Sequence, residues 1–228
     1  MCPPADLATL RVCQLAGPDF RPLGLPRRRG VPVNEGEATP AVRPAYGGGR
    51  EALLRAAVHV VATRGLRNLT FRAVATQAGM THGLVRHHFG TRDALIEAAL
   101  EHSIATSMEE GALEPATGEL ADFSASLPAA VSLKPETQAF QYELMLEARR
   151  TPALAHLTER LYASYREATQ RALVAMGLGD DPALTDLVFA ALDGLVFDQL
   201  TQGIDEDRMG RAIERLRTIL IGLRDASL

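Results

Sequence analysis

A length of 228 residues allows one or two domains, and a hydrophobic content of 46% is enough to build a core. No run approaches roughly 18 consecutive apolar residues and the first residues lack the apolar segment of a secretory signal, so we expect neither a transmembrane helix nor secretion. The only two cysteines, Cys2 and Cys13, are too few for a disulfide scaffold and suit a reducing cytoplasm, where we expect the protein to act.

The net charge of −4 is unevenly distributed along the chain. Residues 1–45 hold six Arg against four acidic residues, residues 46–90 hold six Arg against one Glu, and residues 91–228 hold 12 Lys and Arg against 23 Asp and Glu. A compact basic segment in an otherwise acidic chain suggests a local anionic partner, of which phosphate is the obvious one. Judged by charge alone, a basic face that only contacts solvent is an equally good explanation of this segment.

Residues 1–46 have the composition of a disordered extension rich in proline and arginine. Eight prolines interrupt any helical or strand period, and the extension contains the consecutive arginines Arg27–Arg29. Two alternatives stay open. The segment could be a basic arm that lies along DNA, or it could be untranslated, with the true start near Val31, Val33 or Val42.

Helical periodicity begins after the glycines at 47–49 and ends at Gly65. Apolar residues recur at positions i, i+1, i+4, i+7 and i+8, which predicts an amphipathic helix with one buried face. The residues that form this pattern are Leu53, Leu54, Ala57, Val60 and Val61.

Two short helices are predicted next, and threonines stand where their N-caps belong. Thr70 precedes the first helix, which Gly79 ends, and Thr81 precedes the second, which runs through His88. Thr91 can cap a longer helix that follows. Two short helices joined by a tight turn form a helix-turn-helix unit, whose second helix can enter a DNA major groove with its first side chains on base edges.

The rest of the chain is also predicted to be helical, so the expected fold class is all-α. Breaks between helices fall near Pro115, Leu133–Pro135, Thr151–Pro152 and Gly177–Asp181. Residues 182–203 and the last helix repeat apolar residues three and four positions apart, a pattern typical of helices that pack at a shallow angle.

The stretch from Arg50 to Leu95 resembles the DNA-binding domain of the tetracycline-repressor (TetR) family. That family has a basic residue, a helix ending in Gly, a Thr before helix two, an Ala-Gly turn, Ser/Thr-x-Gly, and then Tyr with an aromatic residue or His before Phe. The matching residues here are Arg50, Gly65, Thr70, Ala78–Gly79, Thr81-His82-Gly83 and Arg86-His87-His88-Phe89, and the family's Ser-Lys-Glu-x-Leu is represented by Thr91-Arg92-Asp93-Ala94-Leu95. One departure is Arg86, which replaces the family's tyrosine.

The resemblance implies a three-helix helix-turn-helix DNA-binding domain at residues 47–107 and a helical ligand-binding and dimerisation domain at residues 108–228. It implies a homodimer with two partners, a double-stranded DNA operator and a small-molecule effector, and it implies neither a cofactor nor catalysis. The expected function is a transcriptional repressor that the effector releases from a palindromic operator. The alternatives are an activator of the same family, or an all-helical small-molecule-binding protein, enzyme or interaction module that contains such a turn.

The residues predicted to contact DNA are Thr70, Arg72, Thr81, His82, Gly83, Leu84, Arg86, His87, His88 and Arg92. Thr81 and His82 open the recognition helix and are candidates for base readout, and Leu84 could touch a thymine methyl. Gly83 permits close approach of the backbone to DNA.

The remaining predicted contacts are to phosphate, each with a simpler alternative. Thr70 can contact phosphate while it caps its helix, or it can be a cap alone. Arg72 and Arg92 can reach the DNA backbone, or they can be solvated surface charges. Tyrosine and arginine both reach a phosphate oxygen, and Arg86 could contact either the backbone or a base.

The adjacent His87 and His88 raise two further alternatives. A zinc site needs three or four ligands, whereas adjacent residues on a helix point about 100° apart and chelate poorly. A catalytic pair needs an oriented nucleophile and base, which the neighbouring sequence does not supply. We therefore predict a DNA contact for both histidines, and no metal site.

The resemblance also implies that the last two helices of each subunit form a four-helix bundle. The predicted interface residues are Leu184, Leu187, Val188, Ala191, Leu195, Asp198, Ile213, Leu216 and Leu220. Asp198 is a polar residue on this stripe, so it either pairs across the dimer, marks a ligand pocket or reaches solvent at the rim. The ligand-binding residues stay open; polar groups of the middle helices that could line a pocket are Tyr142, Arg149, His156, Tyr162 and Tyr165.

Overall fold

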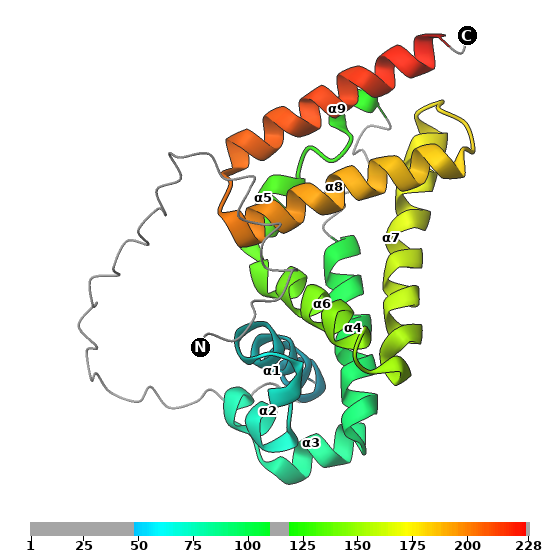
Figure 1. Ribbon diagram of the computed structural model, residues 1–228. Coiled ribbons are helices and arrows are strands. Elements are labelled where there is room, and N and C mark those ends of the chain that lie inside the picture. Colours follow the sequence, from blue (N-terminus) through cyan, green and yellow to red (C-terminus); the bar gives the residue numbers. More distant parts are fainter. Residues whose placement is uncertain (1–47, 110–118, 227–228) are drawn as a thin grey trace, which may run out of the picture. The chain divides into compact units, whose positions relative to one another are not determined.

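The computed structural model describes residues 48–109 and 119–226, and every regular element in these two ranges is a helix (Figure 1). The predicted all-α fold class is therefore confirmed for this part of the chain. The predictions for residues 1–46, and the predicted break near Pro115, lie outside the described residues.

The predicted helix-turn-helix region has the expected helix order. Its elements are α1 (Gly49–Arg64), the short 3-10 helix η1 (Leu66–Asn68), α2 (Phe71–Ala78), α3 (His82–Phe89) and α4 (Arg92–Glu109). Gly79 ends α2 in the left-handed conformation at φ 64°, which favours glycine because it has no Cβ. The sequence did not predict η1, which occupies the link between α1 and α2.

The C-terminal part consists of longer helices. They are η2 (Leu120–Asp122), α5 (Leu127–Leu133), α6 (Pro135–Ala148), η3 (Pro152–Leu154), α7 (Ala155–Ala175), α8 (Pro182–Gln202) and α9 (Glu206–Ala226). The predicted breaks at 133–135, 151–152 and 177–181 are confirmed by this order. Asp181 caps α8, because its side chain accepts hydrogen bonds from the amides of Ala183 and Leu184.

The described residues bury apolar side chains in two clusters. The first joins α1–α4 to α6 and the start of α7, and it includes the fully buried Val85, Phe140 and Leu144. The second joins α5, the end of α7, α8 and α9. A domain boundary between residues 107 and 108 therefore does not separate the two cores, because α6 packs within the core of the helix-turn-helix region.

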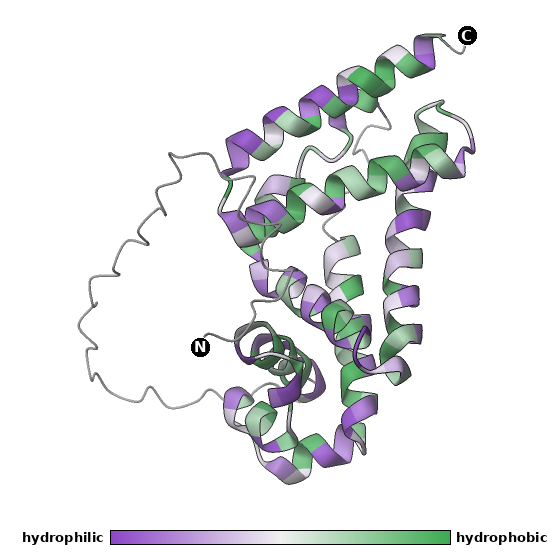
Figure 2. Ribbon diagram, in the orientation of Figure 1, coloured by the Kyte–Doolittle hydropathy of each residue, from purple (hydrophilic) through white to green (hydrophobic). Residues whose placement is uncertain are grey.

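The longest helices are amphipathic or largely apolar, and Figure 2 shows mostly hydrophobic colouring along α8. None of the helices in residues 48–109 and 119–226 is both long enough and apolar enough to cross a membrane. The exposed apolar residues of α8 instead lie on a helix whose opposite face is already buried in the second core.

Candidate nucleic-acid interface

The second helix of the helix-turn-helix, α3, buries one face and exposes the other. Val85 is fully buried and Phe89 nearly so, and their four-residue spacing places both on one side of the helix. The predicted contact residues His82, Gly83, Arg86, His87 and His88 are all exposed. The four-residue spacing places His82 with Arg86, and Gly83 with His87, along the exposed side. The helix thus presents two rows of groups that can donate hydrogen bonds to an anionic partner.

Threonine caps fix the starts of both helices of the unit. The Thr70 hydroxyl accepts a hydrogen bond from the amide of Ala73 at 3.1 Å, and the Thr81 hydroxyl accepts one from the amide of Leu84 at 3.3 Å. Both predicted caps are confirmed, and both threonines are exposed. Because each hydroxyl accepts from the backbone, its own hydrogen remains able to donate to a phosphate oxygen.

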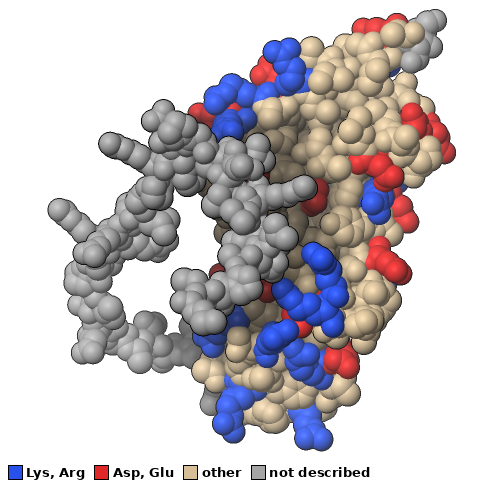
Figure 3. Space-filling model, viewed as in Figure 1, with Lys and Arg blue, Asp and Glu red and all other residues tan. Residues whose placement is uncertain are grey.

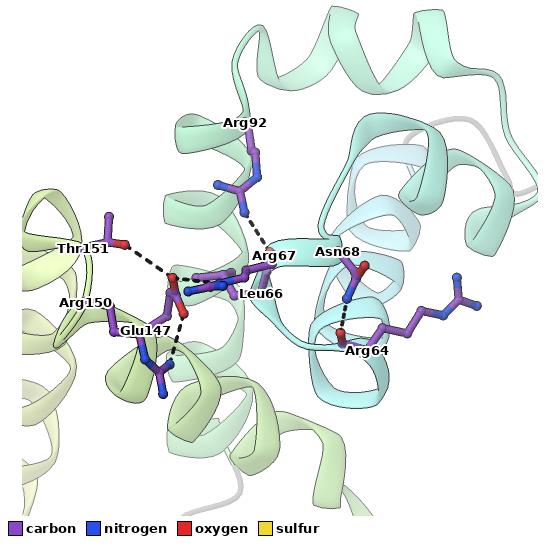
Figure 4. Close-up of polar contacts among 8 residues, drawn as sticks. All are labelled: Arg64, Leu66, Arg67, Asn68, Arg92, Glu147, Arg150 and Thr151. Carbon is purple, nitrogen blue, oxygen red and sulfur yellow. Dashed lines mark hydrogen bonds and ion pairs between the residues drawn. The ribbon is translucent and has the colours of Figure 1, made fainter.

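Two of the predicted DNA contacts have roles within the fold. Leu84 is half-buried and packs against the first core, so it is less available to a thymine methyl than its position in the sequence suggested. Arg92 donates from Nε to the carbonyl of Leu69 at 2.9 Å. It also donates from Nη2 to the carbonyl of Leu66 at 2.7 Å (Figure 4). Arg92 therefore connects α4 to η1 and the residue after it, and its contact to phosphate stays a prediction.

The adjacent histidines are arranged as neighbours on a helix. The ring centroids of His87 and His88 lie 5.5 Å apart, with the rings edge to face. Within the two described ranges, no three His, Cys, Asp or Glu side chains are grouped so that they could hold a metal ion. His82 instead packs its ring against Phe71 of α2, with 5.8 Å between centroids, which orients it at the start of α3.

The surface around α3 is basic. Between Glu51 and Asp93 the chain has no acidic side chain, whereas it has six arginines. Figure 3 shows Lys and Arg gathered over the lower part of the visible face, where Figure 1 places α1 to α3. A positive field at the exposed helix α3 attracts an anionic partner, such as the phosphate backbone of DNA, and repels a basic one.

A polar network connects this region to the C-terminal helices (Figure 4). Glu147, at the end of α6, accepts from Arg67 of η1 at 3.4 Å, from Thr151 at 3.4 Å and from Arg150 at 3.3 Å. Burial alone would raise the pKa of Glu147, but the two arginines outweigh it and the net pKa lies below the ordinary value. A second contact between the same parts joins His59 of α1 to Glu136 of α6, with 2.8 Å between Nδ1 and Oε1.

The lowered pKa of Glu147 predicts a pH-dependent contribution to stability. A carboxylate whose folded pKa is lowered stabilises the fold above its ordinary value of 4.5, and this contribution is lost as the pH falls through the folded pKa. Urea unfolding should therefore show the wild type to be more stable than Glu147→Gln near neutral pH. The difference should close as the pH falls below 4.5. Glu159→Gln, at an exposed position of α7, controls for the loss of one negative charge. A gap between the wild type and Glu147→Gln that is independent of pH would contradict the assignment.

The structure separates the predicted dimer residues into two groups. Val188, Ile213 and Leu220 are buried within the second core of the single chain, so they have no surface to offer to another copy, and we correct them to core residues. Leu184, Leu195 and Leu216 are half-buried against the same core. The exposed members of the predicted interface are Leu187, Ala191 and Asp198.

A pocket lies between α6, α7 and α8, with α5 and the end of α4 contributing the remaining residues. Three of the tyrosines considered from the sequence, Tyr142, Tyr162 and Tyr165, line it. Arg149 and His156 line other depressions of the surface. The acidic side chain in the pocket is Asp193 and not Asp198, which is exposed five residues further along α8.

Hydrogen bonds connect the polar groups of the pocket. The Tyr142 hydroxyl lies 2.9 Å from Oδ1 of Asp193 and 3.1 Å from its carbonyl oxygen. Tyr165 donates to Gln141 at 2.9 Å, and Gln141 donates to Ser103 at 3.3 Å. Burial raises the pKa of Asp193, and burial, followed by the nearby Asp193, raises the pKa of Tyr142. The pocket is therefore an apolar site with a few oriented polar groups, as small-molecule sites commonly are.

Sequence reasoning missed Asp193, although the chain carries a signal for it. Asp193 interrupts the apolar run from Leu187 to Phe197, "LVFAALDGLVF". It lies four residues after Phe189 and three before Val196, and both of these are buried and line the pocket. A charged residue on the buried face of a helix is uncommon without a partner or a function, and this pattern distinguishes Asp193 from Asp198.

Comparisons with known proteins assign both parts of the chain to one family. The family model described as "Bacterial regulatory proteins, tetR family" matches residues 53–99, and the model described as "Tetracyclin repressor-like, C-terminal domain" matches residues 115–226. The HTH-type transcriptional repressor Rv3405c of Mycobacterium tuberculosis (strain ATCC 25618 / H37Rv) is 43% identical over 51 residues, which is 22% of this chain and 27% of that protein. The match thus spans about a quarter of the curated relative and is confined to one segment.

Solved structures extend the likeness to the C-terminal helices. A member of the TetR family from Streptomyces coelicolor A3 (SCO1917) is 29% identical, with a TM-score of 0.58 over 74% of this chain and 97% of that one. The multidrug binding protein EbrR, complexed with imidazole, is 27% identical, with a TM-score of 0.53 over 76% of this chain and 96% of that one. Two models of one family span the helix-turn-helix and the helices that follow it, and the chain therefore belongs to the tetR family of bacterial regulatory proteins.

Proposed function

We propose that the chain is a DNA-binding transcriptional repressor that acts as a homodimer, binds a palindromic operator and is released from it by a small molecule. The observation that carries this proposal is the exposed face of α3, which begins at the threonine cap Thr81 and presents Arg86 and three histidines. The printed name of Rv3405c, a transcriptional repressor that is 43% identical over 51 residues, supports the sign of regulation. We propose a cytoplasmic location, because the proposed partner, DNA, lies in that compartment of a bacterium.

Each side chain of the proposed interface has a role that its chemistry allows. Thr81, His82 and Gly83 lie at the first turn of α3, the part of a recognition helix that meets base edges. Thr70 and Arg72 lie at the start of α2, where hydroxyl and guanidinium groups can hold phosphates and so fix the register of the protein on DNA. Arg86, His87 and His88 follow along α3 and extend the contact.

The proposed dimer uses the exposed sides of α8 and α9. Leu187 on α8 and Ile219 and Leu223 on α9 are exposed in the single chain although they are large and aliphatic. Pairing of these helices with a second copy would bury them, and a two-fold axis would repeat α3 at a second half-site. Two recognition helices about 34–36 Å apart can enter successive major grooves on one side of the duplex.

Coupling between effector and DNA is proposed to run through α6. One side of α6 lines the pocket with Gln141 and Tyr142, and its other side packs against α1. Its end contacts Arg67 through Glu147. The pocket has a volume of about 60 Å³, whereas drug-sized ligands occupy roughly 300–1,000 Å³. An effector of that size must move the lining side chains or helices, and a shift of α6 would change the setting of the DNA-binding helices.

The proposal is tested by the salt dependence of DNA binding. The purified protein should bind one fragment from the DNA that flanks its own gene, and its affinity should fall about 10³-fold between 50 and 200 mM salt if the dimer makes roughly six phosphate contacts. Footprinting should reveal two protected half-sites with two-fold symmetry. A folded dimer that binds neither this DNA nor any sequence selected from random DNA at low salt would overturn the proposal.

A further inference from the structure

The pocket between α6, α7 and α8 contains a single charged side chain. Of the residues that line it, only Asp193 carries a charge, and the others are aliphatic, aromatic or neutral polar. The four rings of Tyr142, Tyr162, Tyr165 and Phe189 lie among them. A negative charge at the wall of an otherwise neutral pocket selects for a ligand with a complementary charge.

Within the described parts of the chain, Asp193 has no cationic partner. Its side chain accepts one hydrogen bond, from the hydroxyl of Tyr142. Arg166 lies over two of the rings, but its Nε pairs with Asp186 at 2.8 Å, on the exposed side of α8. Removal of a carboxylate from water is unfavourable unless a partner compensates for the lost solvation. A bound cation would supply the compensation that the protein does not.

The rings around Asp193 have faces that attract cations. Phe189 stacks on Tyr165, with 6.3 Å between centroids and 16° between planes, and meets Tyr162 edge to face at 5.5 Å. Arg166 already uses this property, because its guanidinium carbon lies 5.4 Å from the ring centroid of Tyr162 and 5.6 Å from that of Phe189. Attraction between a cation and aromatic rings adds to that of the carboxylate and is largest for desolvated cations.

From these contacts we propose that the effector of the pocket is a hydrophobic organic cation, an amine or quaternary ammonium with an apolar body. The cationic group lies beside the carboxylate of Asp193, and the apolar body lies against Phe189 and the tyrosine rings. The inference rests on the proposed function in one respect, because it takes this pocket as the effector site.

The same geometry links the charge of the ligand to α6. The Tyr142 hydroxyl donates a hydrogen bond to the Asp193 carboxylate, beside which the cation would bind. Tyr142 belongs to α6, which packs against α1 of the DNA-binding region. A cation that displaces this hydroxyl breaks a direct hydrogen bond between α6 and α8. Neutral ligands of the same shape lack this effect, because they carry no positive charge that could replace the Tyr142 hydroxyl as the partner of the Asp193 carboxylate.

The test compares two probes of equal shape with the purified full-length protein. Benzyltrimethylammonium carries the charge, and neopentylbenzene replaces its nitrogen by carbon. Isothermal titration at constant ionic strength should show that the wild type binds the cation at least tenfold more tightly than the neutral probe. Asp193→Asn, which keeps the side-chain volume, should lose at least tenfold in affinity for the cation and keep its affinity for the neutral probe. The matched control Asp207→Asn, at an exposed position of α9, should behave as the wild type.

Equal affinity of the wild type for both probes would overturn the inference, as would no saturable binding of the cation or an unchanged cation affinity in Asp193→Asn. The difference in wild-type affinity between the two probes tests the inference even if Asp193→Asn does not fold. DNA binding without probe is measured separately. Binding of the cation through Asp193 without DNA binding would support the ligand class and overturn the proposed function. DNA binding without cation binding would support the proposed function and overturn the ligand class.

Discussion

Replacement of Leu187 by Glu is expected to convert the proposed homodimer into a monomer and to lower operator affinity by at least a hundredfold. Leu187 is 66% exposed in the single chain, so the substitution leaves the core of each subunit intact. In the proposed dimer, burial of each leucine contributes about 1.5–3 kcal/mol. A buried, unpaired carboxylate would instead cost several kcal/mol in each subunit. A monomer then holds one half-site and loses the contacts that the second recognition helix contributes.

Sedimentation analysis at several protein concentrations measures the first effect, and a DNA titration measures the second. The matched control is Leu133→Glu, because Leu133 is 79% exposed on α5, a helix outside the proposed interface. At protein concentrations low enough to dissociate both variants into monomers, both should unfold at the same urea concentration. If Leu187→Glu remained a dimer with unchanged affinity, α8 would not form the interface in the proposed way.

The local features of the fold could be predicted from the sequence because neighbouring residues determine them. Gly79 adopts a positive φ that favours glycine, and Thr70 and Thr81 accept backbone hydrogen bonds from residues three positions ahead. The same holds for the ends of the long helices, where proline or glycine interrupts the period. These interactions depend on sequence spacing alone.

Features that depend on contacts between distant segments could not be predicted in the same way. An apolar stripe shows which side of a helix is buried but not which surface buries it. Val188, Ile213 and Leu220 lie on such stripes and pack within their own chain, whereas Leu187 does not. Likewise, Arg92 matches a family motif, yet its hydrogen bonds to residues 23 and 26 positions earlier depend on how α4 meets η1.

The pocket illustrates the same limit. Periodicity placed Asp198 on the apolar stripe, and a rotation of the helix by a fraction of a turn decides whether Asp193 or Asp198 faces inward. The contact of Asp193 with Tyr142, 51 positions away in sequence, settles the choice. Buried polar residues are thus found by combining an interrupted apolar run with a partner from another helix.

Replacement of Arg86 by Ala is the second change with a large expected effect, because it removes an exposed guanidinium from both recognition helices of the dimer at once. If each guanidinium contributes about 1–3 kcal/mol, the loss per dimer is about 2–6 kcal/mol, which is at least about thirtyfold in operator affinity. The Arg86 side chain is exposed, whereas Val85 and Phe89 fill the core beneath α3, so the fold itself should keep its stability. His82→Ala, which also removes a side chain from both helices, should weaken binding in the same direction.

The salt dependence of Arg86→Ala distinguishes a phosphate contact from a base contact. Loss of a phosphate contact weakens binding to all sequences alike and reduces the slope of log affinity against log salt by about 0.9 for each arginine. Loss of a base contact leaves that slope unchanged and relaxes the preference at one symmetric pair of operator positions. Arg211→Ala, an equal change of charge on the exposed side of α9, controls for the general field of the protein. An affinity as insensitive to Arg86→Ala as to Arg211→Ala would remove Arg86 from the interface and leave the histidines of α3 to read the operator.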